Sequence, residues 1–189
     1  MQIKIGIIGL GYVGLPLAAA FGEKYSVVGF DINADRIALM NRGIDPSNEL
    51  DSEAFEGCDI KFTNQLSDLD SVSFYIVAVP TPIDDSNLPD LKPLLSATES
   101  VAKSLKKGDC VVFESTVYPG CTEEDCVPIL EKASGLTYNE DFFCGYSPER
   151  INPGDKVNTL TTIRKVTSGS TPEVAEWVDQ LYRQVVKAG

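Results

Sequence analysis

A glycine-rich turn near the amino terminus constrains the fold of this chain more than any other feature. The run Gly9-Leu10-Gly11-Tyr12-Val13-Gly14 follows a β-branched stretch at residues 3–8 and precedes a helical pattern at residues 15–24. A GxGxxG pattern in that position is typical of a dinucleotide-binding βαβ unit. Its first glycine permits a tight turn, its second lets a pyrophosphate approach the backbone, and its third lets helix and strand pack closely.

An acidic residue lies where such a unit binds the ribose of its nucleotide. Asp31 ends an expected strand at residues 26–31, 22 residues after Gly9. A carboxylate there accepts hydrogen bonds from ribose hydroxyls and repels a 2′-phosphate, so the pattern predicts NAD rather than NADP as the cofactor. Arg36 follows in the first turns of the next helix, and it is either a side chain lying against the adenine or an ordinary solvated residue.

Apolar runs alternate with helical patterns along the whole chain, which predicts βαβ units. The expected fold is α/β, a Rossmann-type doubly wound, mainly parallel sheet with helices on both faces, in one NAD-binding domain over residues 1–189.

Residues 72–79 form the most apolar stretch and predict a central strand buried on both faces. Residues 44–58 predict a solvated excursion with at most one short helix. Strands are expected at 3–8, 26–31, 59–63, 72–79, 109–115, 141–146 and 163–168, and helices at 15–24, 34–42, 93–107, from 121 to about 133, and 172–187.

Composition and charge limit the partners of this chain. Its 189 residues carry a formal net charge of −12, and the Lys and Arg residues are scattered. A surface this acidic repels phosphate backbones and anionic lipid head groups, so we expect neither nucleic acid nor a membrane as a partner. No apolar run reaches the ~18 residues that span a bilayer, and the amino terminus lacks the pattern of a signal peptide.

The cysteines and the absence of histidine limit the chemistry. Five cysteines form an odd set without CxxC spacing, which argues against a disulfide framework and against a zinc site, so we expect no metal ion. We therefore expect a soluble, cytoplasmic protein. The chain contains no histidine, which excludes every mechanism in which a histidine of this chain is the general base or a metal ligand. Cys121 lies beside an expected helix start, a position that can lower the pKa of a thiol.

Three polar corners follow later strands of the expected sheet. They are Pro80-Thr81-Pro82, Glu114-Ser115-Thr116 and Ser147-Pro148-Glu149-Arg150. Ligands of an open α/β sheet bind in the crevice beyond the carboxyl ends of its strands. Any one corner taken alone can be ordinary turn chemistry, but together the three are expected to converge on the nicotinamide half of the crevice.

These residues carry a resemblance to a known family. The glycine turn extended through Leu15-Pro16, together with Val79-Pro80-Thr81-Pro82, Glu114-Ser115-Thr116-Val117 and Tyr146-Ser147-Pro148-Glu149-Arg150, resembles the UDP-glucose/GDP-mannose dehydrogenase family in order and spacing. The resemblance covers essentially the whole chain. It implies an NAD-dependent oxidation of a UDP-sugar, in which the C6 alcohol becomes a carboxylate in two hydride transfers. It also implies a parent protein that is a homodimer or higher oligomer.

The resemblance also implies roles for individual residues. The pyrophosphate would contact the glycine turn (Gly9, Gly11, Tyr12, Val13 and Gly14), Asp31 would bind the adenosine ribose, and Arg36 would flank the adenosine. Thr81 and Thr116 would border the cofactor. Thr116 and Glu149 would be the catalytic residues: Thr116 would position a water, and Glu149 would act as a general base in hydrolysis of a thioester intermediate. Glu149, Arg150 and Asn152 would bind the substrate.

The chain departs from the family's pattern in two ways. Many UDP-glucose enzymes have a second glutamate where this chain has Pro153, and the run from Glu149 to Gly154 resembles instead the branch that acts on UDP-N-acetylhexosamines, such as UDP-N-acetylglucosamine. The family's nucleophilic cysteine, central helix and UDP-sugar domain belong to sequence after the first domain, and none of the five cysteines matches that nucleophile. We therefore expect the cofactor half of an enzyme, inactive alone. A β-hydroxyacid-type dehydrogenase domain and a non-catalytic NAD-sensing module remain as alternatives.

Overall fold

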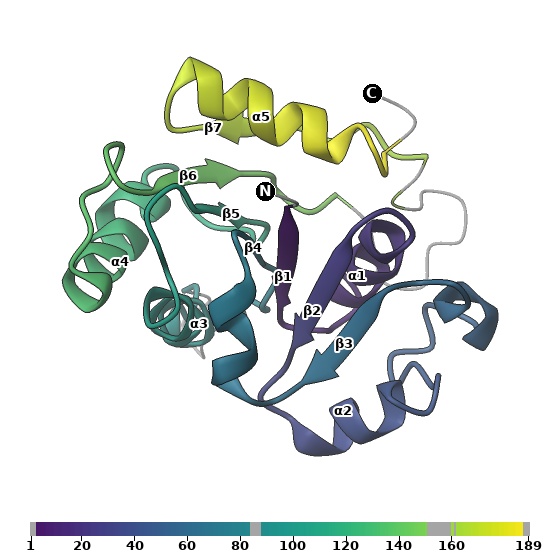
Figure 1. Cartoon of the computed structure of the whole chain (residues 1–189). Helices are drawn as coiled ribbons and strands as arrows, with labels where there is room; N and C mark the ends of the chain where they lie inside the picture. Colours follow the sequence, from purple (N-terminus) through teal and green to yellow (C-terminus); the bar gives the residue numbers. More distant parts are fainter. Residues whose placement is uncertain (1–2, 84–87, 151–159, 161, 187–189) are drawn as a thin grey trace.

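One open sheet forms the centre of the molecule. The structure is a computed structural model that describes residues 3–83, 88–150, 160 and 162–186. The strands lie in the order β3-β2-β1-β4-β5-β6-β7, parallel from β3 to β6 and antiparallel between β6 and β7 (Figure 1). Their bounds are β1 Lys4–Ile8, β2 Ser26–Phe30, β3 Ile60–Thr63, β4 Phe74–Val77, β5 Cys110–Phe113, β6 Phe143–Tyr146 and β7 Ser168–Gly169. The expected fold class is confirmed.

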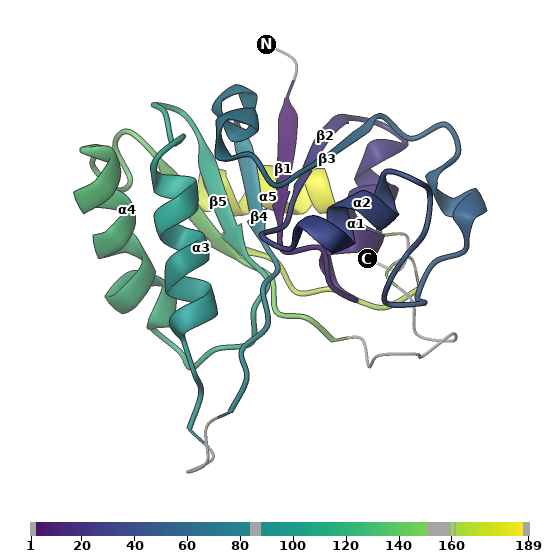
Figure 2. The same cartoon turned by 90° about the horizontal axis from the view of Figure 1, so that it is seen from below.

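Helices cover both faces of this sheet (Figure 2). One apolar core gathers side chains of α1, α2 and α5 against the sheet, and the second gathers those of α3 and α4. The helix bounds are α1 Gly14–Gly22, α2 Ala34–Met40, α3 Lys92–Ala102, α4 Val127–Ser134 and α5 Pro172–Tyr182, with short 3₁₀ helices η1 (Ser52–Phe55) and η2 (Leu66–Ser71) and a π-helical turn η3 (Thr122–Cys126). No helix of the described chain is both long and apolar enough to cross a membrane.

The most apolar stretch of the sequence contains the central strand β4, which is covered by an apolar core on each face of the sheet. Phe74 and Ile76 contribute to the core on one face, while Tyr75 and Val77 contribute to the core on the other. All four side chains are buried, so the predicted two-sided burial is confirmed. The only short helix described within residues 44–58 is η1, as expected for that excursion.

Several expected boundaries are wrong. The last helix, expected at residues 172–187, ends at Tyr182. A last strand is expected at residues 163–168, yet β7 covers only Ser168–Gly169, and the segment before it carries the Lys165 side chain into the protein interior. The helix expected at residues 93–107 ends at Ala102, and the chain then turns towards β5. The helix expected after Gly120 begins as the π-helical turn η3 and becomes α-helical only from Val127.

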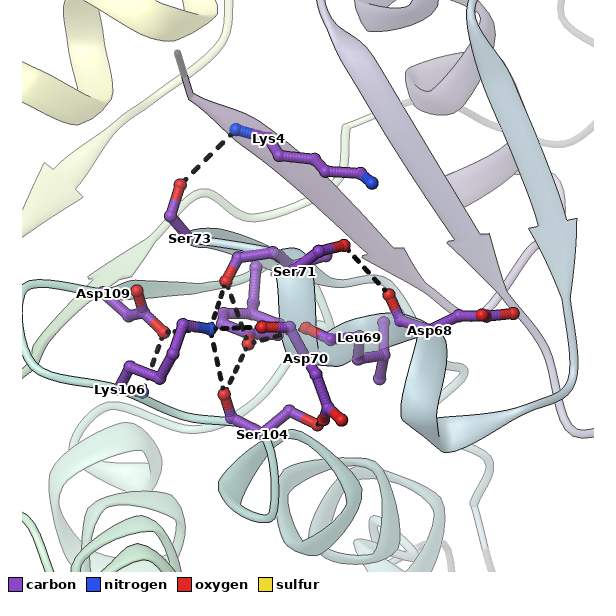
Figure 3. A network of polar contacts seen from close by, with 11 residues as sticks. Lys4, Asp68, Leu69, Asp70, Ser71, Ser73, Ser104, Lys106 and Asp109 are labelled. Carbon is purple, nitrogen blue, oxygen red and sulfur yellow. Dashed lines mark hydrogen bonds and ion pairs between the residues drawn. The ribbon is translucent and has the colours of Figure 1, made fainter. Parts of the chain in front are cut away.

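Polar contacts join η2, which precedes β4, to the segment that precedes β5; Figure 3 shows those of Asp70, Ser104, Lys106 and Asp109. The Lys106 ammonium donates to the backbone carbonyls of Asp70 at 2.9 Å and Val72 at 2.7 Å and lies 3.5 Å from the Asp109 carboxylate. The Ser104 hydroxyl donates to Asp70 at 2.7 Å, and the buried Tyr75 hydroxyl donates to the Ser104 carbonyl at 3.0 Å. We call Asp70, Tyr75, Ser104, Lys106 and Asp109 the amino-end network.

Candidate functional site

The glycine turn leaves β1 in a conformation that suits glycine alone. Gly9 has φ +89°, and its N–H donates to the Phe30 carbonyl of the neighbouring strand at 2.9 Å. A Cβ built on Gly14 would lie 1.8 Å from the Gly9 carbonyl oxygen, so α1 can begin this close to the turn only with glycine there. A Cβ on Gly11 would meet no described atom within 4 Å. The middle glycine is therefore open on the side where a ligand would approach.

The amino terminus of α1 faces the same opening. No side chain caps this end of the helix in the described chain, and Val13 occupies the cap position. Free N–H groups and the positive end of the helix dipole favour an anion at such a terminus. The Tyr12 side chain beside it is 40% exposed. The turn therefore has the geometry of a pyrophosphate site.

A cavity of about 510 Å³ extends from the turn past the end of β2. Its lining includes Asp31, whose carboxylate oxygens accept from the N–H groups of Leu10 and Asn33, each at 2.9 Å. An ionised carboxylate has about four acceptor positions, so two remain for ribose hydroxyls. Arg36 also lines this cavity, and its guanidinium donates to the Leu10 carbonyl at 2.7 Å and to the Ser47 hydroxyl at 2.8 Å. Arg36 is thus held at the rim rather than free in solvent.

The structure brings the three polar corners to one second cavity of about 250 Å³. The cavity is lined by Gly11, Tyr12 and Val13 of the turn and by Ala78, Val79, Pro80, Thr81, Glu114, Ser115, Thr116 and Glu149. Two hydrogen bonds hold the corners together: the Ser115 hydroxyl donates to the Val79 carbonyl at 2.6 Å, and the Glu149 N–H donates to the Glu114 carbonyl at 3.2 Å. The corners therefore form one site at the carboxyl edge.

The unpaired hydroxyl of Thr81 fits a bound ligand. Its Oγ1 atom is buried and has no hydrogen-bond partner among the residues that the structure describes. Leaving a buried hydroxyl unpaired costs about 1–3 kcal/mol, which a ligand group at this position would recover. Together with the open side of Gly11, this atom fits a dinucleotide that runs from the Asp31 cavity into the corner cavity.

The structure does not bring every predicted substrate residue to the site. Arg150 is exposed and its side chain lines neither cavity; its backbone N–H donates to Glu149 Oε1 at 2.6 Å. Asn152 lies outside the described residues. Of the two predicted substrate residues that the structure describes, Glu149 and Arg150, it is Glu149 that lines the corner cavity.

A buried charged cluster beneath the corner cavity was not expected from the sequence. Lys165 Nζ lies 2.5 Å from Glu114 Oε2 and 3.7 Å from Glu149 Oε2, and the Tyr182 hydroxyl donates to Glu114 Oε1 at 2.5 Å. The Lys165 and Glu114 side chains are 2% and 0% exposed. We call Glu114, Glu149, Lys165 and Tyr182 the carboxyl-end cluster. An acid directly after an apolar strand was a sequence signal for Glu114, but no local pattern marks Lys165 or Tyr182.

Burial dominates the electrostatics of this cluster. It raises the pKa of Glu114 to about 7, against the opposing effects of the Lys165 ammonium and the Tyr182 hydroxyl. Burial also raises the pKa of Tyr182 well above its ordinary value, and the charge of Glu114 adds to that shift. A carboxyl with a raised pKa in a cavity is a common mark of a functional site.

The thiols of the chain are poorly suited to nucleophilic chemistry. Burial raises the pKa of Cys121 to about 12, so the lowered pKa considered for this helix start is wrong. Burial raises the pKa of Cys110 to about 12 and that of Cys126 to about 11. All five thiols are free. Within the described ranges, no group of three or more Cys, Asp or Glu side chains is placed to hold a metal ion.

These features define a class of protein. A parallel sheet with its crevice between β1 and β4, a GxGxxG turn and an acid at the end of β2 form a dinucleotide-binding domain of the dehydrogenase type. The chain belongs to the UDP-glucose/GDP-mannose dehydrogenase family, and residues 3–186 match the family's NAD binding domain.

Individual relatives agree with this assignment. A UDP-N-acetyl-D-glucosamine 6-dehydrogenase of Pseudomonas aeruginosa is 61% identical over all 189 residues, and one of Salmonella typhi is 54% identical. The solved structure of an NDP-N-acetyl-D-galactosaminuronic acid dehydrogenase from Methanosarcina mazei Go1 superimposes with a TM-score of 0.90 at 30% identity, over 100% of this chain and 43% of that one. The chain spans 45% and 44% of the length of the two dehydrogenases from Pseudomonas and Salmonella.

Proposed function

We propose that this chain is the NAD-binding half of a UDP-N-acetylhexosamine 6-dehydrogenase, with UDP-N-acetylglucosamine as the favoured substrate. The observation that carries the proposal is the corner cavity, where Thr81, Thr116 and Glu149 lie beside the glycine turn. A domain that only binds a dinucleotide has no need of a carboxylate at that place. The run from Glu149 to Gly154 and the high identity to two UDP-N-acetyl-D-glucosamine 6-dehydrogenases support the choice of sugar.

In this proposal the residues of the chain divide the work of binding. The glycine turn and the start of α1 hold the pyrophosphate, Asp31 holds the adenosine ribose, and Arg36 borders the adenosine. Thr81 donates to or accepts from the part of the cofactor that enters the corner cavity, since its hydroxyl is buried there. Bound NAD supplies the hydride acceptor for both oxidations. Asp31 excludes NADP by repelling its 2′-phosphate.

Glu149 acts on water in the hydrolytic step. Water held by Thr116 gives a proton to the Glu149 carboxylate while its oxygen bonds to the acyl carbon of the thioester. The carbon–sulfur bond then breaks, and the thiolate leaves with the electron pair of that bond. A general base positioned in this way contributes about 10²–10⁴-fold to a rate. Arg150 and Asn152 are proposed to contact the sugar nucleotide.

The remaining parts of the active site come from sequence that this chain does not contain. The nucleophilic cysteine is one of them, because four of the five cysteines here are buried and none of the five matches the family's nucleophile. We propose that a central helix and a UDP-sugar domain follow residue 189 and that the whole protein is a homodimer or higher oligomer. We also place it in the cytoplasm, without nucleic-acid or membrane partners, on the basis of its net charge of −12 and its free thiols.

Calorimetric titration tests the binding half of the proposal. The chain is titrated with NAD and then NADP, each with and without UDP-N-acetylglucosamine, and we expect NAD to bind while the sugar nucleotide is inert. Gly11→Ala is the matched variant, because its methyl group meets open space in the folded chain yet occupies the approach to the pyrophosphate. Its stability should stay within about 0.5 kcal/mol of the wild type. Its NAD affinity should fall at least about tenfold.

Turnover by the full-length protein tests the catalytic half. We expect UDP-N-acetylglucosamine to yield two NADH per sugar and a carboxylate product, with slower turnover of UDP-glucose. NAD binding without turnover of any UDP-sugar would favour the NAD-sensing alternative instead. Release of a single NADH per substrate, with a 3-keto or aldehyde product, would favour a β-hydroxyacid-type enzyme.

A further inference from the structure

We infer that Lys165, anchored by Glu114 and Tyr182, is a positioning residue that fixes the Glu149 carboxylate towards the corner cavity. The inference rests on the proposed function for the role of Glu149 in hydrolysis, but the placement itself depends only on this chain. Lys165 comes from the segment before β7, Tyr182 from α5, and Glu114 from the end of β5. The segment before β7 and the helix α5 thus converge on the Glu114 carboxylate at the end of β5.

The two oxygens of Glu149 face different groups. Oε1 accepts from the Arg150 N–H at 2.6 Å, while Oε2 lies 3.7 Å from the Lys165 ammonium. The backbone N–H of Glu149 is in turn held by the Glu114 carbonyl at 3.2 Å. The Glu149 side chain is 9% exposed, so contacts within the protein rather than bulk water set its orientation. Removing Lys165 takes away the cation that Oε2 faces.

Glu114 and Glu149 share the Lys165 ammonium unequally. Glu114 takes the short contact with Lys165 at 2.5 Å, and this leaves the longer contact of 3.7 Å for Glu149. Because Coulomb attraction falls with distance, the close pair fixes the ammonium beside Glu114, and the longer contact orients Oε2 of Glu149.

Stability alone is a weak explanation for this arrangement. A buried ion pair often contributes little net stability relative to apolar residues of similar volume, because both charges lose hydration. Here a single ammonium serves two carboxylates, so their charges do not cancel when both are ionised. The cluster also opens onto the corner cavity through Glu114 and Glu149. A positioning role accounts for both the excess carboxylate and the location.

Kinetics of the full-length protein test the role in hydrolysis. Lys165→Met should lower steady-state kcat with UDP-N-acetylglucosamine by about tenfold to a hundredfold, less than the loss of the base itself. The KM for the sugar nucleotide and the Kd for NAD should stay within about twofold, because Lys165 lines neither cavity. The burst of NADH in the first turnover should keep its rate, with acyl-enzyme accumulating in acid-quenched samples. A burst slowed as much as kcat would overturn the inference.

Three further variants separate positioning from simple destabilisation. Lys165→Arg should retain most of the kcat, since it keeps the charge. The double variant Glu114→Gln/Lys165→Met removes both partners of the close pair and should fold more stably than Lys165→Met, yet its kcat should stay low. Recovery of kcat in the double variant would mean that Lys165 acts through stability alone. Lys107→Met removes an exposed ion pair with Asp141 and should leave every readout unchanged.

A crystallographic readout keeps the inference separate from the proposed reaction. In crystals of the wild-type chain the Glu149 carboxylate should occupy one conformer, and in Lys165→Met it should be displaced or split between conformers. If the full-length wild type oxidises no UDP-sugar, the proposed function fails, and this comparison still decides the placement. An unchanged Glu149 in the Lys165→Met crystals would overturn the inference even if the enzyme proves active.

Discussion

Two polar groups lie at opposite ends of β5, and they are built differently. In the amino-end network the Lys106 ammonium has three backbone carbonyls and one carboxylate around it, and half of its side chain reaches solvent. In the carboxyl-end cluster the Lys165 ammonium is buried between two carboxylates, Glu114 and Glu149. The first arrangement buries one carboxylate, Asp109, beside its ammonium, whereas the second encloses two carboxylates around one ammonium.

The two groups also differ in whether they border a cavity. The amino-end network lines neither of the two cavities described above, and its contacts join η2 to the segment before β5. The carboxyl-end cluster opens onto the corner cavity. Ligands of open α/β sheets bind beyond the carboxyl ends of the strands. Polar groups at the amino ends can therefore all pair within the protein, whereas polar groups at the carboxyl ends must stay available to a ligand. The comparison teaches that an unbalanced buried charge, rather than burial itself, marks the functional edge.

The largest contrast is expected when each lysine is removed. Lys165→Met should lower the free energy of unfolding by about 3–5 kcal/mol, because it leaves the Glu114 carboxylate buried without its cation. Lys106→Met should cost only about 1 kcal/mol, since the Lys106 side chain is 49% exposed and solvent takes over part of its role. Urea unfolding at pH 8 measures both. Equal losses would show that the two groups are equivalent in energy.

The pH dependence of stability should single out Glu114. Its pKa of about 7 in the folded chain exceeds the ordinary 4.5, so the folded state binds this proton more tightly than the unfolded state. The contribution to stability is therefore full below pH 4.5 and is lost as the pH rises through 7. It amounts to about 3 kcal/mol, each tenfold change in proton affinity corresponding to about 1.4 kcal/mol.

Unfolding curves from pH 4.5 to 8 test this expectation. Glu114→Gln should remove that part of the slope, while Glu99→Gln, at an exposed position on α3, should keep the wild-type slope. Identical slopes in the wild type and Glu114→Gln would contradict the raised pKa of Glu114.

Substitutions should change NAD binding only when they lie at the carboxyl edge of the sheet. Asp31→Ala should weaken NAD binding by about tenfold to a hundredfold, because hydrogen bonds to a charged group contribute about 1.5–3 kcal/mol. It should also narrow the preference over NADP, since the repulsion of the 2′-phosphate is lost. Calorimetry with both cofactors measures the two effects. An unchanged NAD affinity would remove Asp31 from the binding site.

The smallest effect is expected from Tyr75→Phe in the amino-end network. The variant loses the buried hydrogen bond to the Ser104 carbonyl and should cost about 1 kcal/mol of stability. The Lys106 ammonium still reaches the Ser104 carbonyl at 3.3 Å, which limits the loss. NAD affinity should not change. A weakened NAD affinity would show that the two edges of the sheet are coupled.

Much of the fold was predictable because its signals are local. The β1 strand, the glycine turn and α1 form one continuous pattern, and Asp31 follows at the end of the next apolar run. The three polar corners were predictable as a group, because the carboxyl ends of parallel strands share one edge of a sheet. The short β7 and the π-helical turn η3 were not predictable in this way, since long-range packing decides them.

The sequence alone determined the sheet, the binding turn and the cofactor class, because strand periodicity, turn chemistry and one acid at a fixed spacing act over neighbouring residues. Tertiary structure decided the carboxyl-end cluster. Lys165 and Tyr182 lie 51 and 68 residues from Glu114 along the chain, and they meet it only after the segment before β7 and the helix α5 have packed against the sheet. A buried ion pair leaves no periodic or local signal in a sequence, since its partners are matched in space and not in order.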